Sequence, residues 1–520
     1  MKIKKYALNE IPHPNNLKEL VDIRAAMPNT TAFQYKKKKE IVSVTTAQFK
    51  NDIECLGTYL FDCGIRDSKV ALIGENSYEW ILSYFAVVNG GNVIVPIDKE
   101  LSNADIADMI KQSEATALIY SDAYSDIAEE NAHLKLFNMK SFEEYISQGK
   151  DSITSGNGDY IIYKIDNYKM CSIIYTSGTT GKPKGVMLCH KNLATDIICS
   201  CENAYIAGQS MLTLPLHHTF AFSTSVLSML LWGVTISINS SLRTFKQDMK
   251  DFKPQNILMV PLYVETMYKN IWSAAKEQGK EKLIKAMLVM TSALRKTGID
   301  LRRKIFKSIL AEFGGNLDLI VSGGAPIKEK YIEFFDKIGI TVLNGYGISE
   351  CSPVVAVSRN KARVEGSVGL ILRCNQAKIQ DGEILLKGEN VMLGYYNDDV
   401  ATKEAFSDGW FKTGDLGYIR DDYLFITGRK KNLIILSNGK NVSPEELEEK
   451  LLEIPNVKEV VVYAENDLIT AEIYAESKDG IEDGINKLNK ALPIYKQIQN
   501  IKFRDTEFEK TTTKKIKRGN

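Results

Sequence analysis

Runs of apolar residues alternate with polar stretches along the first 360 residues, and their spacing switches between helical and extended. Apolar residues recur every three or four positions, as on one face of a helix, at residues 17–26, 46–61 and 78–88. Short apolar runs typical of buried strands occur at residues 70–73, 92–96, 117–120, 170–175, 256–261 and 318–321. Strands that alternate with helices predict a layered α/β sheet.

The pattern changes after residue 360. Residues 364–428 hold short strand patterns and the turn dipeptides Asp381-Gly382 and Asp408-Gly409, which predict a small barrel or a distorted sheet. Further on, residues 457–463 and 468–475 predict a pair of strands. We therefore expect a large N-terminal domain of residues 1–429 and a small C-terminal domain of residues 430–520.

Polar residues mark where some elements begin. Ser102 is a plausible N-cap, with Asp105 three positions on in a weaker variant of the capping box. Ser443-Pro444-Glu445-Glu446 predicts a helix start, with Ser443 as the cap and Glu446 completing a capping box. The charge run at residues 36–39 predicts a solvated turn.

Composition limits the function classes. The chain has 520 residues, with 66 Lys and Arg against 65 Asp and Glu, which argues against a general nucleic-acid binder. Its eight cysteines include no Cys-x-x-Cys pair, and its five histidines do not fall at zinc-site spacing, so we expect free thiols in a reducing compartment. Neither a signal peptide nor an apolar run of membrane-spanning length is found, so we expect a cytoplasmic protein for which peripheral membrane contact stays open.

The stretch Tyr175–Gly185 carries the strongest chemical signal. It reads Tyr-Thr-Ser-Gly-Thr-Thr-Gly-Lys-Pro-Lys-Gly and follows a predicted buried strand. Glycines let the backbone approach an anion, consecutive N–H groups form an anion nest, and hydroxyls and lysines add donors and charge. It is not a Walker A loop, because Pro183 follows Lys182 where that pattern needs Ser or Thr. We interpret it as a polyphosphate-binding loop; an ordinary Gly/Thr-rich surface loop is the alternative.

Three further constellations fit a nucleotide site. Asn344–Glu350 places an aromatic, a hydroxyl and a carboxylate beside two glycines; an aromatic can stack on a purine, and a carboxylate suits Mg²⁺. Asp415, in a Thr-Gly-Asp tripeptide, can accept two ribose hydroxyls. The turn at Ser322–Pro326 could let a planar ring lie on its backbone. Alone, each is also compatible with an ordinary turn.

Taken in order from residue 175 to 518, these motifs resemble those of the AMP-forming adenylating enzymes, the superfamily of acyl-CoA synthetases, nonribosomal-peptide adenylation domains and beetle luciferases. The wording of Gly324-Ala325-Pro326 and Gly428-Arg429-Lys430-Lys431 looks most like bacterial fatty-acyl-CoA synthetases. The resemblance implies an α/β fold: a large N-terminal domain of layered sheets plus a small β-barrel, followed by a mobile α+β C-terminal domain that carries a catalytic lysine.

The resemblance also implies site residues. The residues expected to hold ATP phosphates are Thr176, Ser177, Gly178, Thr179, Thr180, Gly181 and Lys184. Those expected around the adenine and the α-phosphate are Gly323, Gly324, Ala325, Asn344, Gly345, Tyr346, Gly347 and Ser349, with Tyr346 stacked on the base. Glu350 is expected to hold Mg²⁺, and Asp415 and Arg429 are expected to hold the ribose. Lys431 is the expected domain pivot, and Gly439 is expected to face the pantetheine tunnel.

Two assignments rest on alignment with the family's motifs. Pro215-Leu216-His217-His218 resembles the Pro-Leu-x-His motif, which places His218 at the carboxylate pocket, although a core histidine is the plainer interpretation. The tail Thr511–Arg518 resembles the Thr-Gly-Lys-Ile-x-Arg ending, which makes Lys515 the catalytic lysine. The family's glycine is Lys514 here, so the choice between Lys514 and Lys515 stays open. Without this context, a basic tail is normally just solvated.

The implied reaction has two steps: a carboxylate attacks the α-phosphate of MgATP to give acyl-AMP and pyrophosphate, and a thiol, expected to be that of coenzyme A, then displaces AMP. No acidic residue occurs in residues 212–243, where amino-acid-activating relatives usually place an Asp, which argues against an α-amino acid. The resemblance of the motifs to those of bacterial fatty-acyl-CoA synthetases leads us to expect a medium- or long-chain fatty acid. The alternatives are loading of a carrier-protein phosphopantetheine, a non-catalytic nucleotide-binding relative and a phosphotransferase.

Overall fold

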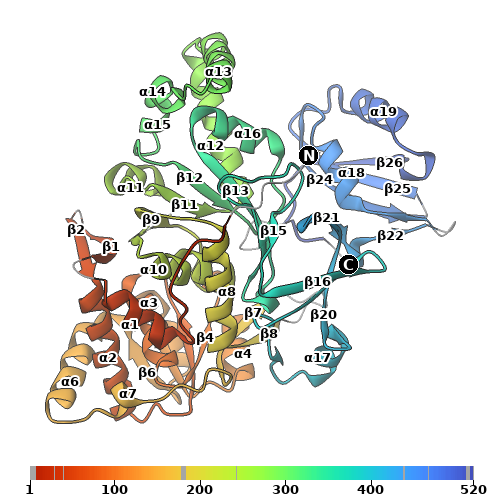
Figure 1. The fold of residues 1–520 in the computed structure, drawn as a ribbon. Helices are drawn as coiled ribbons and strands as arrows, with labels where there is room; N and C mark the ends of the chain where they lie inside the picture. Colours follow the sequence, from red (N-terminus) through yellow and green to blue (C-terminus); the bar gives the residue numbers. More distant parts are fainter. Residues whose placement is uncertain are drawn as a thin grey trace. The chain divides into compact units, whose positions relative to one another are not determined.

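The computed structural model describes residues 7–27, 30–38, 40–176, 183–239, 241, 243–436, 440–466, 468–510 and 516–518. The chain forms two compact units (Figure 1): the first comprises Met1–Gln376 with Gly388–Glu404, and the second comprises Ala377–Lys387 with Ala405–Asn520. The expected pivot at Arg429–Lys431 lies inside the second unit and stays a prediction.

The first unit holds two large sheets. Among the described residues, the first sheet has seven strands in the order β18-β8-β7-β4-β3-β5-β6. Their bounds are β18 (Gly394–Tyr395), β8 (Lys184–Cys189), β7 (Met170–Thr176), β4 (Val93–Pro96), β3 (Lys69–Ile73), β5 (Ala117–Tyr120) and β6 (Lys135–Asn138). The central strands are parallel and almost wholly buried, because helices cover both faces of such a sheet.

Helices of this half are α1 (Leu17–Ala25), α2 (Thr46–Asp62), α3 (Tyr78–Val88), α4 (Asn103–Gln112), α5 (Ser125–Glu130), α6 (Phe142–Thr154), α7 (Asp159–Ile162) and α8 (His190–Asn203). The helices expected at residues 17–26, 46–61 and 78–88 are thus confirmed. On one face of the sheet, α4 and α5 pack Ile106, Met109 and Ile127 against Ala71 and Leu118. Ser102 caps α4 as expected, accepting from the Asp105 N–H at 3.2 Å.

The second sheet runs β2-β1-β10-β9-β11-β12-β13-β14-β15 within this unit. Its bounds are β2 (Glu40–Thr45), β1 (Thr31–Lys37), β10 (Thr235–Ile238), β9 (Gln209–Leu212), β11 (Asn256–Met259), β12 (Leu319–Ser322), β13 (Thr341–Gly347), β14 (Val354–Val357) and β15 (Leu370–Ile371). All neighbouring strands from β1 to β13 in this order are parallel, and only β2 at the edge is antiparallel to its neighbour β1. The carboxyl ends of β9, β11, β12 and β13 therefore meet at one edge, where ligands bind in open α/β sheets.

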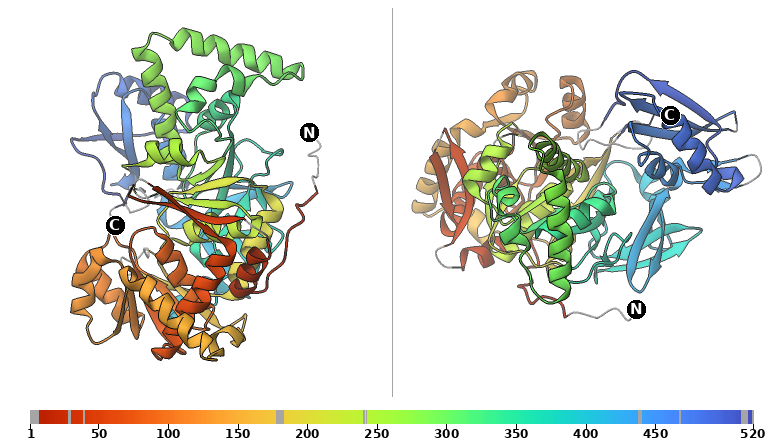
Figure 2. Two further views of the ribbon diagram at one scale, coloured as in Figure 1. Left: turned by 90° about the vertical axis from the view of Figure 1, so that its left-hand side faces the viewer. Right: turned by 90° about the horizontal axis from the view of Figure 1, so that it is seen from above.

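Helices around this sheet are α9 (Thr219–Phe222), α10 (Ser228–Trp232), α11 (Phe245–Phe252), α12 (Pro261–Glu277), α13 (Glu281–Lys296), α14 (Arg302–Ile305), α15 (Lys307–Ala311) and α16 (Glu329–Ile338). A second core forms where α12 and α16 press Val264, Met267 and Phe335 onto Ile257 and Ile320 of the strands. Helix α13 lies outside this layer, at the edge of the unit (Figures 1 and 2).

The second unit is smaller and mixed α+β. Its elements are β16 (Asn375–Gln380), β17 (Glu383–Gly388), β19 (Phe406–Ser407), β20 (Trp410–Arg420), β21 (Tyr423–Arg429), β22 (Ile434–Ile435), β23 (Asn441–Val442), α18 (Pro444–Leu451), β24 (Val457–Glu465), β25 (Leu468–Ala475), α19 (Ile481–Ala491) and β26 (Asn500–Arg504). The short helix α17 (Asp399–Ala405) precedes β19. The expected pair at residues 457–463 and 468–475 is confirmed as the antiparallel strands β24 and β25.

One local prediction holds only in part, and another is wrong. Of the expected solvated turn at residues 36–39, Lys37 and Lys38 are exposed and Lys38 lies in a turn, but Lys36 is half-buried in β1, where its Nζ forms ion pairs of 2.6 Å with both Asp248 and Asp251. The predicted capping box of α18 does not form. Ser443 occupies the N-cap, but its hydroxyl donates to the Thr427 carbonyl at 2.9 Å, and Glu446 pairs instead with lysines.

The eight cysteines are all free thiols, as expected. Within the described part of the chain, no helix is long and apolar enough to cross a membrane.

Candidate active site

The expected phosphate loop joins two paired strands. β7 and β8 are antiparallel, and the partner of Thr176 across the pair is Lys184, whose carbonyl accepts from the Thr176 hydroxyl at 3.4 Å. The strand pairing therefore brings both ends of the loop together. Ser177, Gly178, Thr179, Thr180 and Gly181 lie outside the described residues, so their contacts to phosphate stay predictions.

Lys184 and Glu350 meet at Tyr395, a residue that the sequence did not single out. The Tyr395 hydroxyl donates to Glu350 Oε1 at 2.9 Å, and Lys184 Nζ lies 5.0 Å from the centroid of the Tyr395 ring. Burial, followed by the Glu350 charge, raises the pKa of Tyr395 well above its usual value, so this hydroxyl stays a donor. Tyr395 reaches this place because β18 pairs with β8, setting Tyr395 opposite Val186. No local motif indicates that pairing.

The expected adenine motif occupies the end of β13. Asn344, Gly345 and Gly347 lie in this strand, where Gly345 pairs with Val357 and Gly347 pairs with Val354 of β14. A Cβ on Gly347 would lie 2.2 Å from the Pro353 carbonyl oxygen, so only glycine fits there. Tyr346 faces Ala356 across the same pair. The short helix Ser349–Cys351 then carries Ser349 and Glu350 beyond the strand end.

The second expected adenine segment follows the neighbouring strand. β12 and β13 are parallel, with Ser322 opposite Asn344, so Gly323, Gly324 and Ala325 leave the sheet beside the adenine motif. Gly324 has φ +83°, which favours glycine, and a Cβ on Gly323 would lie 2.9 Å from the Phe220 ring. The tertiary structure thus brings together two motifs that are separated by about twenty residues.

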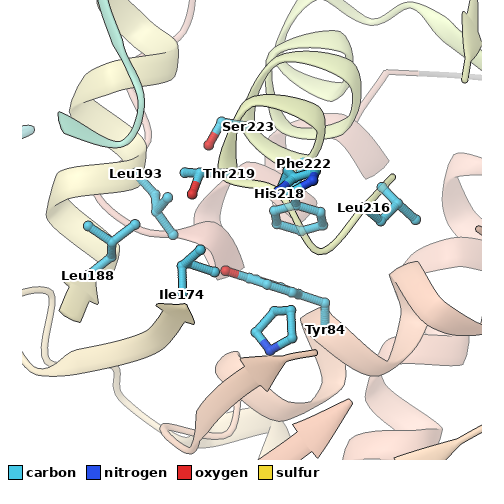
Figure 3. Close-up of a pocket in the computed structure, with 10 residues that line it drawn as sticks. Tyr84, Ile174, Leu188, Leu193, Leu216, His218, Thr219, Phe222 and Ser223 are labelled. Atoms are coloured by element: carbon cyan, nitrogen blue, oxygen red, sulfur yellow. The ribbon is translucent and has the colours of Figure 1, made fainter. Parts of the chain in front are cut away.

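A small apolar cavity lies beside His218 (Figure 3). Its volume is about 10 Å³, room for one water molecule. The lining side chains are Tyr84, Pro96, Ile174, Leu188, Leu193, Leu216, His218, Thr219, Phe222 and Ser223. None of them is acidic, as the sequence predicted for this region. Tyr84 and Phe222 close one wall, with ring centroids 3.8 Å apart.

His218 is linked to a partly buried carboxylate, that of Asp98, through its neighbour His217. His217 Nε2 lies 3.2 Å from His218 Nε2 and 3.4 Å from Asp98 Oδ1, and Asp98 Oδ1 also accepts from the Glu100 N–H at 2.9 Å. Burial alone would raise the pKa of Asp98, but the contacts with His217 and the Glu100 N–H outweigh it and lower the pKa to about 2. Because an ionised carboxylate only accepts hydrogen bonds, Asp98 favours a proton on His217 Nε2, the atom that lies near both Asp98 and His218. No sequence motif pointed to Asp98, which follows β4.

The cavity wall contains an irregular helix. Residues Ser223–Leu227 form a π-helical turn between α9 and α10. The Ser228 hydroxyl donates to the Ser223 carbonyl at 3.0 Å, and the Ser223 hydroxyl donates to the Ser352 carbonyl at 2.9 Å. Such turns are frequent at functional sites. Here the hydroxyls of Ser223 and Ser228 are occupied by backbone carbonyls, so neither of these two offers a free hydroxyl to the cavity.

The expected ribose residues pair with each other within the second unit. Asp415 and Arg429 are partners across β20 and β21, and Arg429 Nε lies 2.8 Å from Asp415 Oδ1. Asp415 is buried, so this contact holds the carboxylate in place. Lys431 follows in a short helix, where burial and the nearby charges of Arg429 and Arg518 lower its pKa.

The C-terminal tail is held against the second unit on both sides of the expected lysine. Lys510 and Ile516 form a β-bridge, and Arg518 pairs with Glu448 of α18. Lys514, Lys515 and Gly439 lie outside the described residues. Their expected roles therefore stay predictions.

Comparison with known proteins gives a family match over most of the chain. A family model described as AMP-binding enzyme matches residues 22–396. A long-chain-fatty-acid–CoA ligase of Mycobacterium bovis is 31% identical over 452 residues, covering 81% of this chain and 75% of that protein. A chloroplastic long-chain-fatty-acid–[acyl-carrier-protein] ligase of Arabidopsis thaliana is 27% identical, covering 82% and 71%. An o-succinylbenzoate CoA synthetase of Bacillus subtilis, solved with its acyl-adenylate, is 21% identical with a TM-score of 0.75, covers 96% of both chains and supports the α/β fold.

Proposed function

Since the chain belongs to the family of AMP-binding enzymes and is an AMP-forming acid–CoA ligase, we propose that its acid is a medium- or long-chain fatty acid. Two observations support this. The relative at 31% identity is named for long-chain fatty acids, and the cavity beside His218 is lined mainly by apolar side chains with no carboxylate to hold an ammonium group. The apolar lining is the observation that carries the proposal.

An acyl chain needs more room than this cavity offers. A volume of about 10 Å³ holds one water, so the Tyr84–Phe222 contact must open when the chain enters. The Tyr84 hydroxyl points toward Ile174 (Figure 3), and we infer that rotation of the two rings would enlarge the cavity on this side. The acyl chain would then lie between the two sheets of the first unit, with its carboxylate at His218.

We infer the following division of work in the first step. The loop after Thr176, with Lys184, binds the ATP phosphates, and the strand ends at Gly323–Ala325 and Asn344–Gly347 enclose the adenine, with Tyr346 stacked on it. The acid's carboxylate oxygen attacks the α-phosphorus, the bond to the pyrophosphate oxygen breaks, and pyrophosphate leaves. Lys515 offsets the charge that builds on the α-phosphate in the transition state.

Glu350 suits a magnesium ion. Mg²⁺ is usually held by one or two carboxylates together with substrate phosphates, and Glu350 offers a carboxylate that the Tyr395 hydroxyl fixes through Oε1. The ion would neutralise charge on the ATP phosphates. Tyr395 thereby has an orienting role, and Lys184 beside it adds a second positive charge.

In the second step, the coenzyme A thiol attacks the acyl carbon of acyl-AMP, and AMP leaves with the electrons of the broken carbon–oxygen bond. We infer that Lys431 is the pivot about which the C-terminal part of the chain, from residue 430, moves between the two steps, and that Gly439 then faces the pantetheine. Asp415 and Arg429 hold the ribose in this scheme.

A carrier protein is the second candidate for the acceptor. The Arabidopsis relative is named for the ligation of long-chain fatty acids to an acyl-carrier protein. Both acceptors present the same phosphopantetheine thiol, so the choice depends on the surface around the thiol entrance rather than on the adenylation site.

The experiment is incubation with MgATP, coenzyme A and an equimolar mixture of acids: fatty acids of graded length, a succinylbenzoate and an amino acid. Mass spectrometry should find a medium- or long-chain acyl-CoA with matching AMP. Acyl-AMP that turns over only after a carrier protein is added would favour the second candidate. Preferential consumption of the aromatic acid, or formation of ADP, would overturn the proposal.

A further inference from the structure

Helix α13 presents apolar side chains to solvent along one face. The outer face, as we name it, consists of Leu283, Ala286, Val289, Met290 and Ala293, which recur at helical spacing and are all exposed. The exposed fractions are 56% for Leu283, 72% for Val289 and 46% for Met290. An exposed apolar face of this kind marks an interaction surface.

The opposite face of α13 already has its packing partner. Ile284 and Thr291 are buried, and Met287 and Leu288 pack against the core formed with α12 and α16. The helix is therefore apolar on both sides, although only one side faces the protein. The loop after it continues the exposed apolar surface with Ile299 and Leu301, which are 49% and 38% exposed.

Positive charge is concentrated on the same segment. Residues 261–311, from α12 to α15, contain eleven Lys and Arg against four Asp and Glu, a net charge of +7. The whole chain has 66 against 65, so the remainder carries −6. In the part of the chain that the structure describes, no ion pair engages Lys282, Lys285 or Lys296, which lie on α13 beside the outer face.

We propose that the outer face of α13, with its flanking lysines, docks the enzyme onto an anionic lipid membrane. A helix in the membrane interface buries apolar side chains among the acyl chains while lysines contact anionic headgroups. Helix α13 lies at the edge of the first unit (Figures 1 and 2). The proposal goes beyond the ligase reaction; the proposed fatty-acid substrate, which partitions into membranes, would give the docking a purpose.

The positive charge of residues 261–311 argues against a second copy of the chain as the partner of the outer face. A two-fold contact through the outer face would bring two segments of +7 together, and like charges opposite each other oppose association. An anionic lipid surface complements the same charges.

The test is co-sedimentation of the full chain with vesicles of phosphatidylcholine alone and with added phosphatidylglycerol. We expect binding to the anionic vesicles that weakens as salt is added. The double variant Val289→Ser, Met290→Ser should weaken binding at least about tenfold, because it removes the apolar contacts. Lys282→Glu with Lys296→Glu should weaken it about fivefold or more for each lysine.

Matched controls come from exposed residues elsewhere in the first unit. Ile162→Ser changes a side chain that is 73% exposed in α7, and Lys111→Glu with Lys150→Glu makes the same change in net charge on α4 and α6. Both controls should bind anionic vesicles as the wild-type chain does. Circular dichroism and activity on a short soluble acid verify that each variant is folded.

Three results would overturn the proposal: no binding of the wild type to anionic vesicles, equal binding by variants and controls, or a dimer in sedimentation velocity that the Val289 and Met290 changes dissociate. Binding to an acidic carrier protein in place of vesicles, lost with Lys282→Glu and Lys296→Glu, would also overturn it. The vesicle assay contains no ATP, coenzyme A or acid, so its failure is distinguishable from failure of the proposed ligase specificity.

Discussion

Tyr395 donates its phenolic hydrogen to Glu350 Oε1 at 2.9 Å, although 45 positions separate the two residues in the chain. The contact exists because β18 joins the edge of the first sheet beside β8. It fixes one carboxylate oxygen of the residue that we expect to hold Mg²⁺, and it places the ring of Tyr395 next to Lys184.

Tyr395→Phe should therefore raise the Mg²⁺ concentration needed for half-maximal pyrophosphate release about tenfold, because a hydrogen bond to a charged group is lost. The measurement is pyrophosphate release against Mg²⁺ at saturating ATP and acid. Tyr396→Phe is the matched control, since the Tyr396 hydroxyl donates to Glu114 at 2.6 Å on the surface. Equal behaviour of the two variants would contradict the orienting role of Tyr395.

Asp98→Asn should lower kcat for adenylation about tenfold while KM for ATP stays unchanged. The neutral amide attracts the proton on His217 Nε2 less strongly than the carboxylate does, so the His217 ring that lies against His218 is held less firmly. Because the pKa of Asp98 is lowered to about 2, its carboxylate stays ionised and the defect should be constant from about pH 5 to pH 8. Asp98→Glu should recover part of the rate; a loss in KM for ATP alone would argue against this positioning role.

Lys515→Ala should slow acyl-AMP formation by about a hundredfold or more, because a charge that stabilises the transition state is removed. Thioester formation from supplied acyl-AMP should proceed at the wild-type rate. Lys514→Ala is the control and resolves the choice left open by the departure from the family's ending. Should Lys514→Ala show the larger first-step defect, the assignment shifts by one residue; equal loss of both steps in Lys515→Ala would refute the role.

His190 should make folding stability fall as the solution is acidified. Its ring is fully buried: Nδ1 accepts from the Leu17 N–H at 3.3 Å, which leaves Nε2 to donate to the Val88 carbonyl at 3.2 Å. Burial lowers the pKa of His190 to about 4, against the hydrogen bond to Val88, which raises it. The unfolded chain, with a pKa near 6.5, binds the proton first, so stability drops as pH falls from 6.5 toward 4.

The contribution of His190 to this loss should be about 2 kcal/mol between about pH 7 and pH 5. Urea unfolding at the two pH values measures it. The comparison is with His190→Gln, which keeps a donor and an acceptor but does not titrate. Between these pH values its free energy of unfolding should fall by about 2 kcal/mol less than that of the wild type. A His190→Gln slope equal to that of the wild type would contradict the prediction.

Much of the fold follows from local patterns. The helix at Tyr78–Val88 and the strands β5 and β25 were predictable to within a residue, since each depends on spacing and burial along one short segment. The ordered motifs likewise identified the family, because the chemistry of phosphate, adenine and ribose contacts depends on residue type and short spacing.

The tertiary structure decided the contacts between residues that lie far apart in the sequence. Tyr395 and Asp98 stand in no recognisable motif, and only strand pairing and loop packing bring them to Glu350 and His217. The same holds for Lys36 and Ser443, whose partners come from other elements of the chain. Sequence alone thus determined the elements and the reaction class. The partners of the reactive groups and the exposed apolar face of α13 depend instead on which elements pack together. The reason is that hydrogen bonds and burial form between surfaces that no short stretch of chain contains.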